Sequence, residues 1–103
     1  PVNLISETFT PQSTGLVMIR VVAKVYNNTI GDGVSVTLLA GSNPIDADTY
    51  TQEGLANNHH YIILYYEGVY PIGTPQTFSV QYNAITGGTA YCEIQEFTIE
   101  EVY

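Results

Sequence analysis

The residues that could carry chemistry in this sequence are few, and the adjacent His59 and His60 are its only histidines. They open a stretch rich in β-branched and aromatic residues, which predicts a strand. Side chains alternate between the two faces of a strand, so the two imidazoles should point to opposite faces and cannot chelate one ion together. A trimer could bring three copies of one histidine around a metal, but we expect a plainer arrangement, with half-exposed histidines at the entrance of the strand.

Asp46 and Asp48 come closest to a pair of catalytic carboxylates, because a spacing of two residues places both on one face of a strand. An acid–base pair needs one carboxyl group that is desolvated, and no neighbouring residue suggests this. We therefore expect solvated acids at a sheet edge, with Asp46, Asp48 and Tyr50 facing outward. Ile45 and Ala47 are expected to face the core.

The single cysteine, Cys92, lies in an alternating apolar run, which favours a buried free thiol and excludes an internal disulfide. No sequence signature brings a nucleophile and a base together, and the chain has neither a glycine-rich phosphate loop nor a Cys/His zinc pattern. We therefore expect a protein that is not an enzyme and that holds no cofactor and no metal.

The charge of the chain limits its partners. The net charge is −8, and Arg20 and Lys24 are the only cations, which argues against binding to nucleic acid or to anionic membranes. No apolar run approaches the roughly 18 residues of a membrane span. Charged residues make up only 12% of the chain, so Thr, Ser, Asn, Gln and Tyr must form the solvent face, as in many extracellular and virion β-proteins. Because the chain starts at Pro1 with a strand-like segment, we expect a domain excised from a longer protein.

The spacing of turns predicts a single all-β domain over residues 1–103. Turn signals recur about every ten residues and no helical periodicity is visible, which indicates a two-sheet antiparallel sandwich. In the last strand the apolar alternation changes phase at Gln95 and Glu96, and a β-bulge at that pair would explain the change. The expected strands cover residues 3–10, 16–26, 34–40, 45–51, 59–70, 77–84 and 90–103.

The strand 16–26 has one unbroken apolar face, from Val17 to Val25, which we assign to the core. Its opposite face mixes apolar residues with Arg20 and Lys24. Two interpretations stay open: a solvated face that carries two surface charges, or an interface whose cations pair with carboxylates.

The strand 59–70 is apolar or aromatic on both faces. A strand of a two-layer sandwich has one face toward the core and one toward water, so the second apolar face needs a cover. Ile62, Leu64 and Tyr66 can join the core, and in a chain of this length another copy of the same chain is the most economical cover for the rest. The predicted subunit-interface residues are Tyr61, Ile63 and Tyr65, with Arg20 and Lys24 as second choices.

The sequence resembles the trimeric jelly-roll heads of the tumour-necrosis-factor-like or complement-head-like type, which occur on phage tail fibres, viral spikes and capsid decorations. The resemblance lies in the long strand 16–26 after a Pro/Thr/Ser/Gly turn, in the aromatic stretch 61–66, and in the pairing of 73–81 with 88–100. It implies a jelly-roll topology, a homotrimer around a threefold axis, and distal loops that can bind a host cell-surface receptor or glycan. The implied location is the virion surface or the extracellular space.

Two other functions remain as alternatives. One is a monomeric carbohydrate-binding sandwich, because nine tyrosines offer many flat apolar rings with a hydroxyl group. The absence of tryptophan favours subunit packing over carbohydrate binding as the role of these tyrosines. The other is an immunoglobulin-like surface module in a larger protein, which predicts no self-association.

Overall fold

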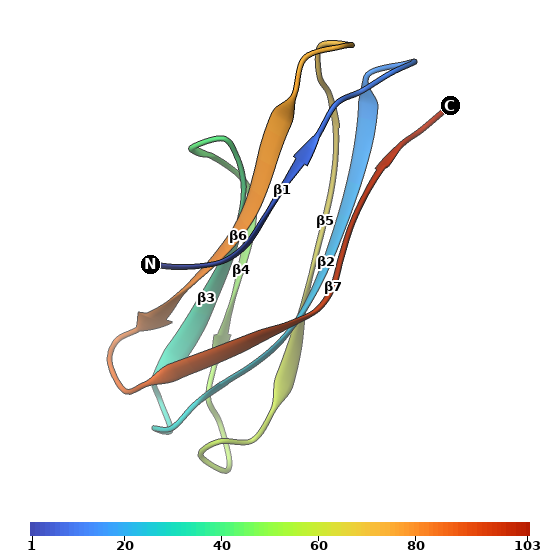
Figure 1. The fold of residues 1–103 in the computed structure, drawn as a ribbon. Helices are drawn as coiled ribbons and strands as arrows, with labels where there is room; N and C mark the ends of the chain where they lie inside the picture. The colour runs from blue at the N-terminus through green and yellow to red at the C-terminus, as the bar shows by residue number, and fades with distance from the viewer.

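The computed structural model describes all residues 1–103 and contains only strands and loops (Figure 1). Seven strands follow one another along the chain, as the spacing of the turns predicts. They are β1 (Val2–Phe9), β2 (Leu16–Asn27), β3 (Gly33–Ala40), β4 (Asn43–Thr51), β5 (His60–Val69), β6 (Gln76–Ile85) and β7 (Ala90–Glu101).

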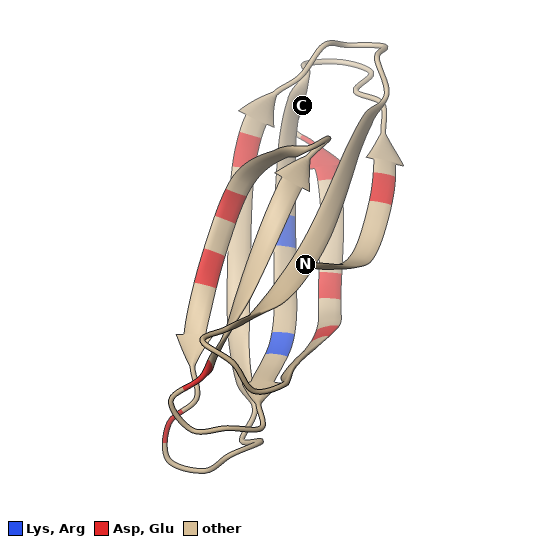
Figure 2. Cartoon of the chain, turned by 90° about the vertical axis from the view of Figure 1, so that its left-hand side faces the viewer, with Lys and Arg blue, Asp and Glu red and all other residues tan.

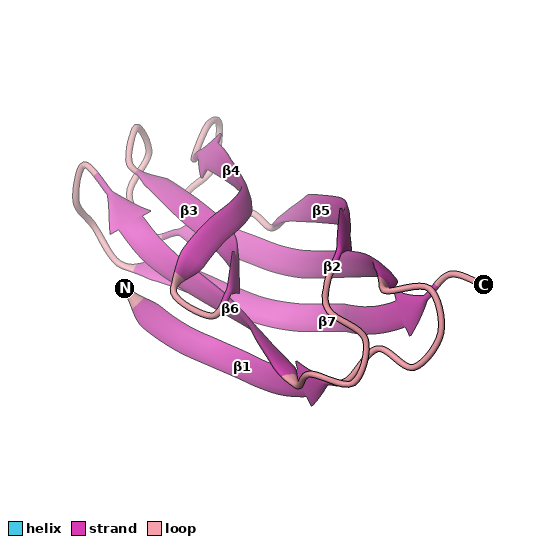
Figure 3. Cartoon of the chain, turned by 90° about the horizontal axis from the view of Figure 1, so that it is seen from above, coloured by secondary structure: helices cyan, strands magenta, loops and turns pink.

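The strands form two antiparallel sheets, and this confirms the predicted sandwich. One sheet has the order β1-β6-β3-β4 and the other the order β5-β2-β7, so that β1 and β7 lie along one side of the sandwich and β4 and β5 along the other (Figures 1 and 3). The pairs β1–β6, β2–β5 and β3–β4 are nested as in one long rolled hairpin, and β7 pairs with β2. A jelly roll has eight strands, so the jelly-roll topology stays a prediction for this chain.

The core is built mainly from the inward-facing residues of β2, β3, β5 and β6, with Ala90 from β7, and their alternation matches the sequence pattern. The inner face of β2 is fully buried from Val17 to Val25, as predicted. Burial of each large aliphatic or aromatic side chain contributes about 1.5–3 kcal/mol. The other strands contribute Val34, Val36 and Leu38 from β3, Ile62 and Leu64 from β5, and Phe78 and Val80 from β6.

The predicted β-bulge in β7 is present at Gln95. Val22 of β2 pairs with Glu96, whereas the next residue, Ala23, pairs with Ile94, so that Gln95 has no partner. The extra residue restores the phase of the strand, because Phe97 then packs against the core while Glu96 turns outward.

The prediction for β4 is wrong in its phase. Asp46, Asp48 and Tyr50 lie opposite Leu38, Val36 and Val34, and so they share the inner face of the sheet instead of the outer one. A bulge at Ile45 causes the shift, because the partner of Leu38 is Asp46 and the partner of Leu39 is Pro44.

Two of the other expectations for β4 can be compared directly with the structure. Ile45 packs against the core, as predicted, and so does Tyr50. Ala47 is exposed and lies opposite Thr37 on the outer face, so its predicted inward orientation is wrong.

The end of the molecule near the C-terminus is held together by one carboxylate. Glu101, at the end of β7, accepts four backbone N–H groups of the loop before β2, at distances of 2.7–2.9 Å, from Gln12, Ser13, Thr14 and Gly15. The N–H donor of Gln12 and those of its neighbours lower the pKa of Glu101, against the opposing effect of burial. Gly15 adopts a left-handed φ of +76° in this loop, which favours glycine.

At the opposite end, two buried amides tie the loops together. Asn27 donates to the carbonyl groups of Gly33 and Gly87, and its own N–H donates to the Gln52 side chain. Gln52 in turn donates to the carbonyl groups of Leu55 and Asn58. Both side chains have no solvent exposure, and this fixes the start of β3, the loop before β5 and the loop between β6 and β7 relative to the end of β2.

Candidate subunit interface

The outer face of the sheet β5-β2-β7 contains every residue predicted for the interface. Its side chains form rows across the three strands, with an aromatic or aliphatic residue on β5, an aliphatic residue or a cation on β2 and mostly an acid on β7. The rows join Tyr61, Lys24 and Glu93, then Ile63, Val22 and Glu96, then Tyr65, Arg20 and Thr98. Five residues separated in the sequence are thereby collected on one surface.

The column on β5 is the most apolar part of this face. Tyr61, Ile63 and Tyr65 are 53%, 55% and 49% exposed, whereas Ile62 and Leu64 between them are 2% exposed. Ile62 and Leu64 thus belong to the core, as predicted. Exposed large side chains in an unbroken column are unusual on a monomer, where apolar residues are normally scattered singly.

Polar contacts hold Tyr65 in position. Its backbone N–H donates to the Asp46 carboxylate on β4 at 3.2 Å, and its phenol O–H donates to the Glu67 carboxylate. The hydrogen bond to Glu67 is the main reason why the pKa of Tyr65 is raised, so the ring stays neutral. The aromatic ring is therefore presented in a defined orientation.

The two cations of the chain lie in the middle of the face, on β2 (Figure 2). Arg20 forms an ion pair with Glu96, with a distance of 3.1 Å between Nε and Oε2. Both partners are about half exposed, so the pair contributes at most about 1 kcal/mol in a monomer. Lys24 forms no ion pair and lies between Tyr61 and Glu93.

A stack of three rings closes one end of the face. Tyr26 lies between His59 and Tyr91, with ring centroids 4.9 Å and 4.5 Å apart and nearly parallel planes. His60 stacks instead on Tyr50 of β4, at 4.2 Å. The two histidines thus point to opposite faces of the strand, as predicted from their adjacency.

Cys92 and the acids do not form a reactive cluster. Cys92 is half-buried, and this burial raises the pKa of its thiol to about 11, which keeps it protonated and weakly nucleophilic. No group of three or more His, Cys, Asp or Glu side chains is placed to hold a metal ion. Asp46 and Asp48 bind backbone N–H groups, which is a structural use of the carboxylates.

The stacked rings, the Glu101 anchor and the Asn27–Gln52 network were not foreseen from the sequence. A glutamate at a strand end or an asparagine before a turn is common, and only the folded chain reveals which backbone groups it meets. The stack of Tyr26 with Tyr91 had a weak signal, because both rings lie on outward positions of strands that could be neighbours.

The structure contains no helix that could span a membrane. A scan of protein-family models and a search of curated proteins both found no match to this chain.

Proposed function

We propose that this chain is a non-enzymatic assembly domain that forms a homotrimer through the outer face of the sheet β5-β2-β7. The half-exposed column of Tyr61, Ile63 and Tyr65 carries the proposal. Covering such a column removes apolar surface from water, which contributes about 25 cal/mol per Å². Aromatic residues and arginine are also the residue types that dominate binding energy at interfaces.

The distribution of charge supports the same face. A net charge of −8 makes most approaches between two copies repulsive. Both cations lie on this face, where they can pair with carboxylates of another copy and offset part of that repulsion. Lys24, which forms no ion pair within its own chain, is available for a carboxylate of the next copy.

The proposed setting is the surface of a virion, as a spike, a tail-fibre head or a capsid decoration that attaches to the host or stabilises the particle. This part of the proposal rests on the resemblance to trimeric jelly-roll heads and on the low content of charged residues. In such a trimer the loops at one end of the sandwich are free to contact a receptor.

A monomeric carbohydrate-binding domain is the second candidate, because the stack of His59, Tyr26 and Tyr91 leaves two aromatic ring faces open at its ends. Sugars bind to open aromatic faces, but both faces of Tyr26 are already covered by His59 and Tyr91. Only the outer ring faces of the stack remain for a sugar. A clear hit on a glycan array, lost in Tyr91→Ala, would favour this function.

The oligomeric mass tests the proposal. Sedimentation equilibrium at micromolar concentration should give three times the mass of one chain, and Tyr65→Asp should reduce it to one. Thr49→Asp is the matched control, because Thr49 is exposed on the outer face of the other sheet. A wild-type monomer, or an unchanged mass for Tyr65→Asp, would refute this interface.

A further inference from the structure

The two sides of the sandwich differ in whether the backbone groups at their strand edges are free. On the side formed by β4 and β5, side chains occupy several edge donors. The N–H groups of Ala47 and Thr49 are bound by the carboxylates of Asp46 and Asp48, at 3.0 Å and 2.8 Å. Asp46 also accepts the N–H of Tyr65 on β5. Side chains thus occupy edge donors on both strands, which blocks the addition of another strand.

The edge of β7 on the opposite side is open. β7 is 12 residues long and contains no proline, and between Ala90 and Glu100 its backbone forms hydrogen bonds only in the ladder with β2. The side chains of Ile94, Phe97 and Ile99 pack against the core but remain partly exposed along this edge. A strand added here would cover them.

The hydrogen-bond phase of the sheet identifies the free donors. The Tyr65 N–H points away from β2 toward Asp46, so its partner Arg20 must direct its own backbone groups toward β7. Thr98, opposite Arg20, therefore bonds to β2, and the alternate residues Phe97 and Ile99 direct their N–H and C=O groups to the open edge.

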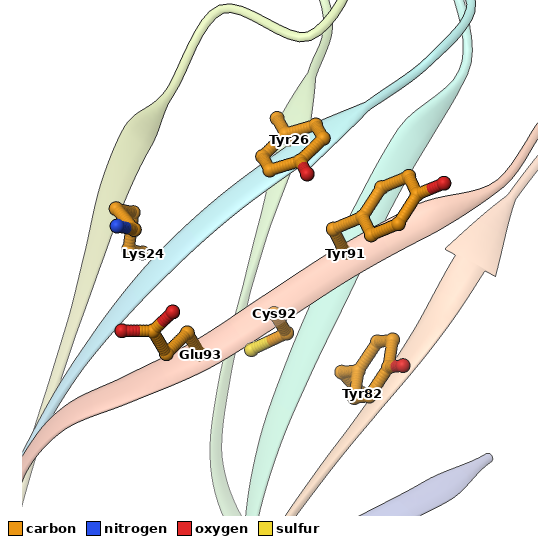
Figure 4. A pocket seen from close by; sticks show the side chains of 6 residues that line it. All are labelled: Lys24, Tyr26, Tyr82, Tyr91, Cys92 and Glu93. Atoms are coloured by element: carbon orange, nitrogen blue, oxygen red, sulfur yellow. The ribbon is translucent and has the colours of Figure 1, made fainter.

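Two hollows flank this edge. One, of about 220 Å³, lies between β1 and β7 and is lined by Glu7, Thr8, Phe9, Phe97 and Ile99. The other, of about 180 Å³, is lined by Lys24, Tyr26, Tyr82, Tyr91, Cys92 and Glu93 (Figure 4). They lie on either side of the bulge at Gln95, which divides the edge into two shorter segments.

The charges along the edge select the partner. Glu93 and Glu100 are exposed on the outer side of β7, and Glu7 faces the hollow from β1. Opposite charges on neighbouring strands stabilise a sheet, and like charges destabilise it. A second copy pairing along β7 would place these acids against one another, which argues against self-pairing at this edge.

We propose that the edge of β7 beyond the bulge, residues 96–100, binds an extended segment of another protein by strand addition. The segment alternates apolar and basic side chains: the apolar ones cover Phe97 and Ile99 on the inner side, and the basic ones pair with Glu100 on the outer side. Main-chain hydrogen bonds to Phe97 and Ile99 supply the pairing, and the charges supply the specificity. This site uses the free backbone edge of β7, whereas the proposed subunit interface is centred on the outer face of β5 and β2.

A nine-residue peptide of alternating Lys and Val is a suitable probe, and the same peptide with Glu in place of Lys is its control. Calorimetry with the full chain should show binding at least about tenfold tighter for the Lys peptide. Amide hydrogen exchange followed by NMR should show new protection at Phe97 and Ile99. Equal affinity for both peptides, no binding of the Lys peptide, or protection elsewhere would overturn the proposal.

Charge reversal provides a second test that does not depend on folding defects. The variant Glu100→Lys changes only one exposed side chain, and its fold can be checked by circular dichroism. It should lose the preference for the Lys peptide over the Glu peptide. A folded variant that keeps the wild-type preference would show that Glu100 does not select the partner and would overturn the proposal.

Discussion

The outer faces of the two sheets cover the same core but are built from different residues. The face of β1-β6-β3-β4 presents Ser, Thr, Asn and Gln with no charge on its two central strands β3 and β6, whereas the face of β5-β2-β7 presents Tyr, Ile and Val beside two cations and several acids (Figure 2). Hydroxyl and amide groups are stable in water without a partner. A half-exposed column of two tyrosines and an isoleucine leaves apolar surface in contact with water, so the composition of the second face points to a role beyond folding.

Three alanine substitutions should distinguish how the two outer faces and the core contribute to the free energy of unfolding. Leu64→Ala removes buried side-chain volume and should lower the free energy of unfolding by about 2–5 kcal/mol at any protein concentration. Ile63→Ala should lower it only at concentrations where the protein is assembled. Thr37→Ala, on the polar face, should have no concentration-dependent effect.

Urea unfolding at two protein concentrations measures all three variants. The proposal on the interface fails if Ile63→Ala behaves like Thr37→Ala at both concentrations. If Ile63→Ala lowers the free energy of unfolding equally at both protein concentrations, this side chain stabilises the single chain and not the assembly.

The polar face can be converted to resemble the apolar one. A triple variant with Thr37→Ile, Thr49→Tyr and Asn83→Tyr builds an apolar patch across β3, β4 and β6. Thr49 and Asn83 are exposed and Thr37 is half-buried, so the unfolding of one chain should change little, by about 0.5 kcal/mol or less at each exposed site. Light scattering should show a mass above that of the wild-type protein, or precipitation.

If the triple variant keeps the wild-type mass, exposed apolar area alone does not explain the difference between the faces. The charges and the shape of the β5-β2-β7 face would then have to account for its role.

Glu101→Gln should destabilise the fold and leave the interface intact. The pKa of Glu101 is lowered in the folded chain, so its carboxylate stabilises the protein fully above the ordinary glutamate pKa of about 4.3. This stabilisation is lost as the pH falls through the lower folded-state pKa. We expect Tm to fall by several degrees at neutral pH, with a difference from wild type that shrinks under acidic conditions.

Thermal scans across this pH range, together with the mass at neutral pH, provide the measurement for Glu101→Gln. A Tm difference that stays constant as the pH falls would show that the ionised carboxylate is not what stabilises the loop. A changed mass would link this end of the molecule to assembly.

The sequence was sufficient to predict the strands, because each buried face alternates over several residues without a break. The bulge at Gln95 was predictable for the same reason, since a phase change between two clear alternating runs has only one simple cause. The phase of β4 was not predictable, because the pattern of two apolar residues, Ile45 and Ala47, was too short to reveal a bulge at Ile45.

The proposed interface residues could be named from the sequence only as apolar residues in excess of what the core needs. Tyr61, Ile63 and Tyr65 were apolar residues left over once the core was full, and the sequence did not show which strands would lie beside them. Long-range contacts such as the hydrogen bond from Tyr65 to Asp46, and the row that joins Lys24 to Tyr61, depend on the register of strands far apart in the chain.

The smallest expected effect concerns Arg20, for which the sequence left two interpretations open. If the face is solvated, Arg20→Gln breaks a half-exposed pair with Glu96 and costs at most about 1 kcal/mol. If the face is covered by another copy, Glu96 is left desolvated without its partner, and the cost rises. Comparing Arg20→Gln in the wild type and in the Tyr65→Asp background therefore separates the two cases. An equal loss in urea unfolding in both backgrounds indicates a solvated face, whereas a larger loss in the wild type places Arg20 at the contact between subunits.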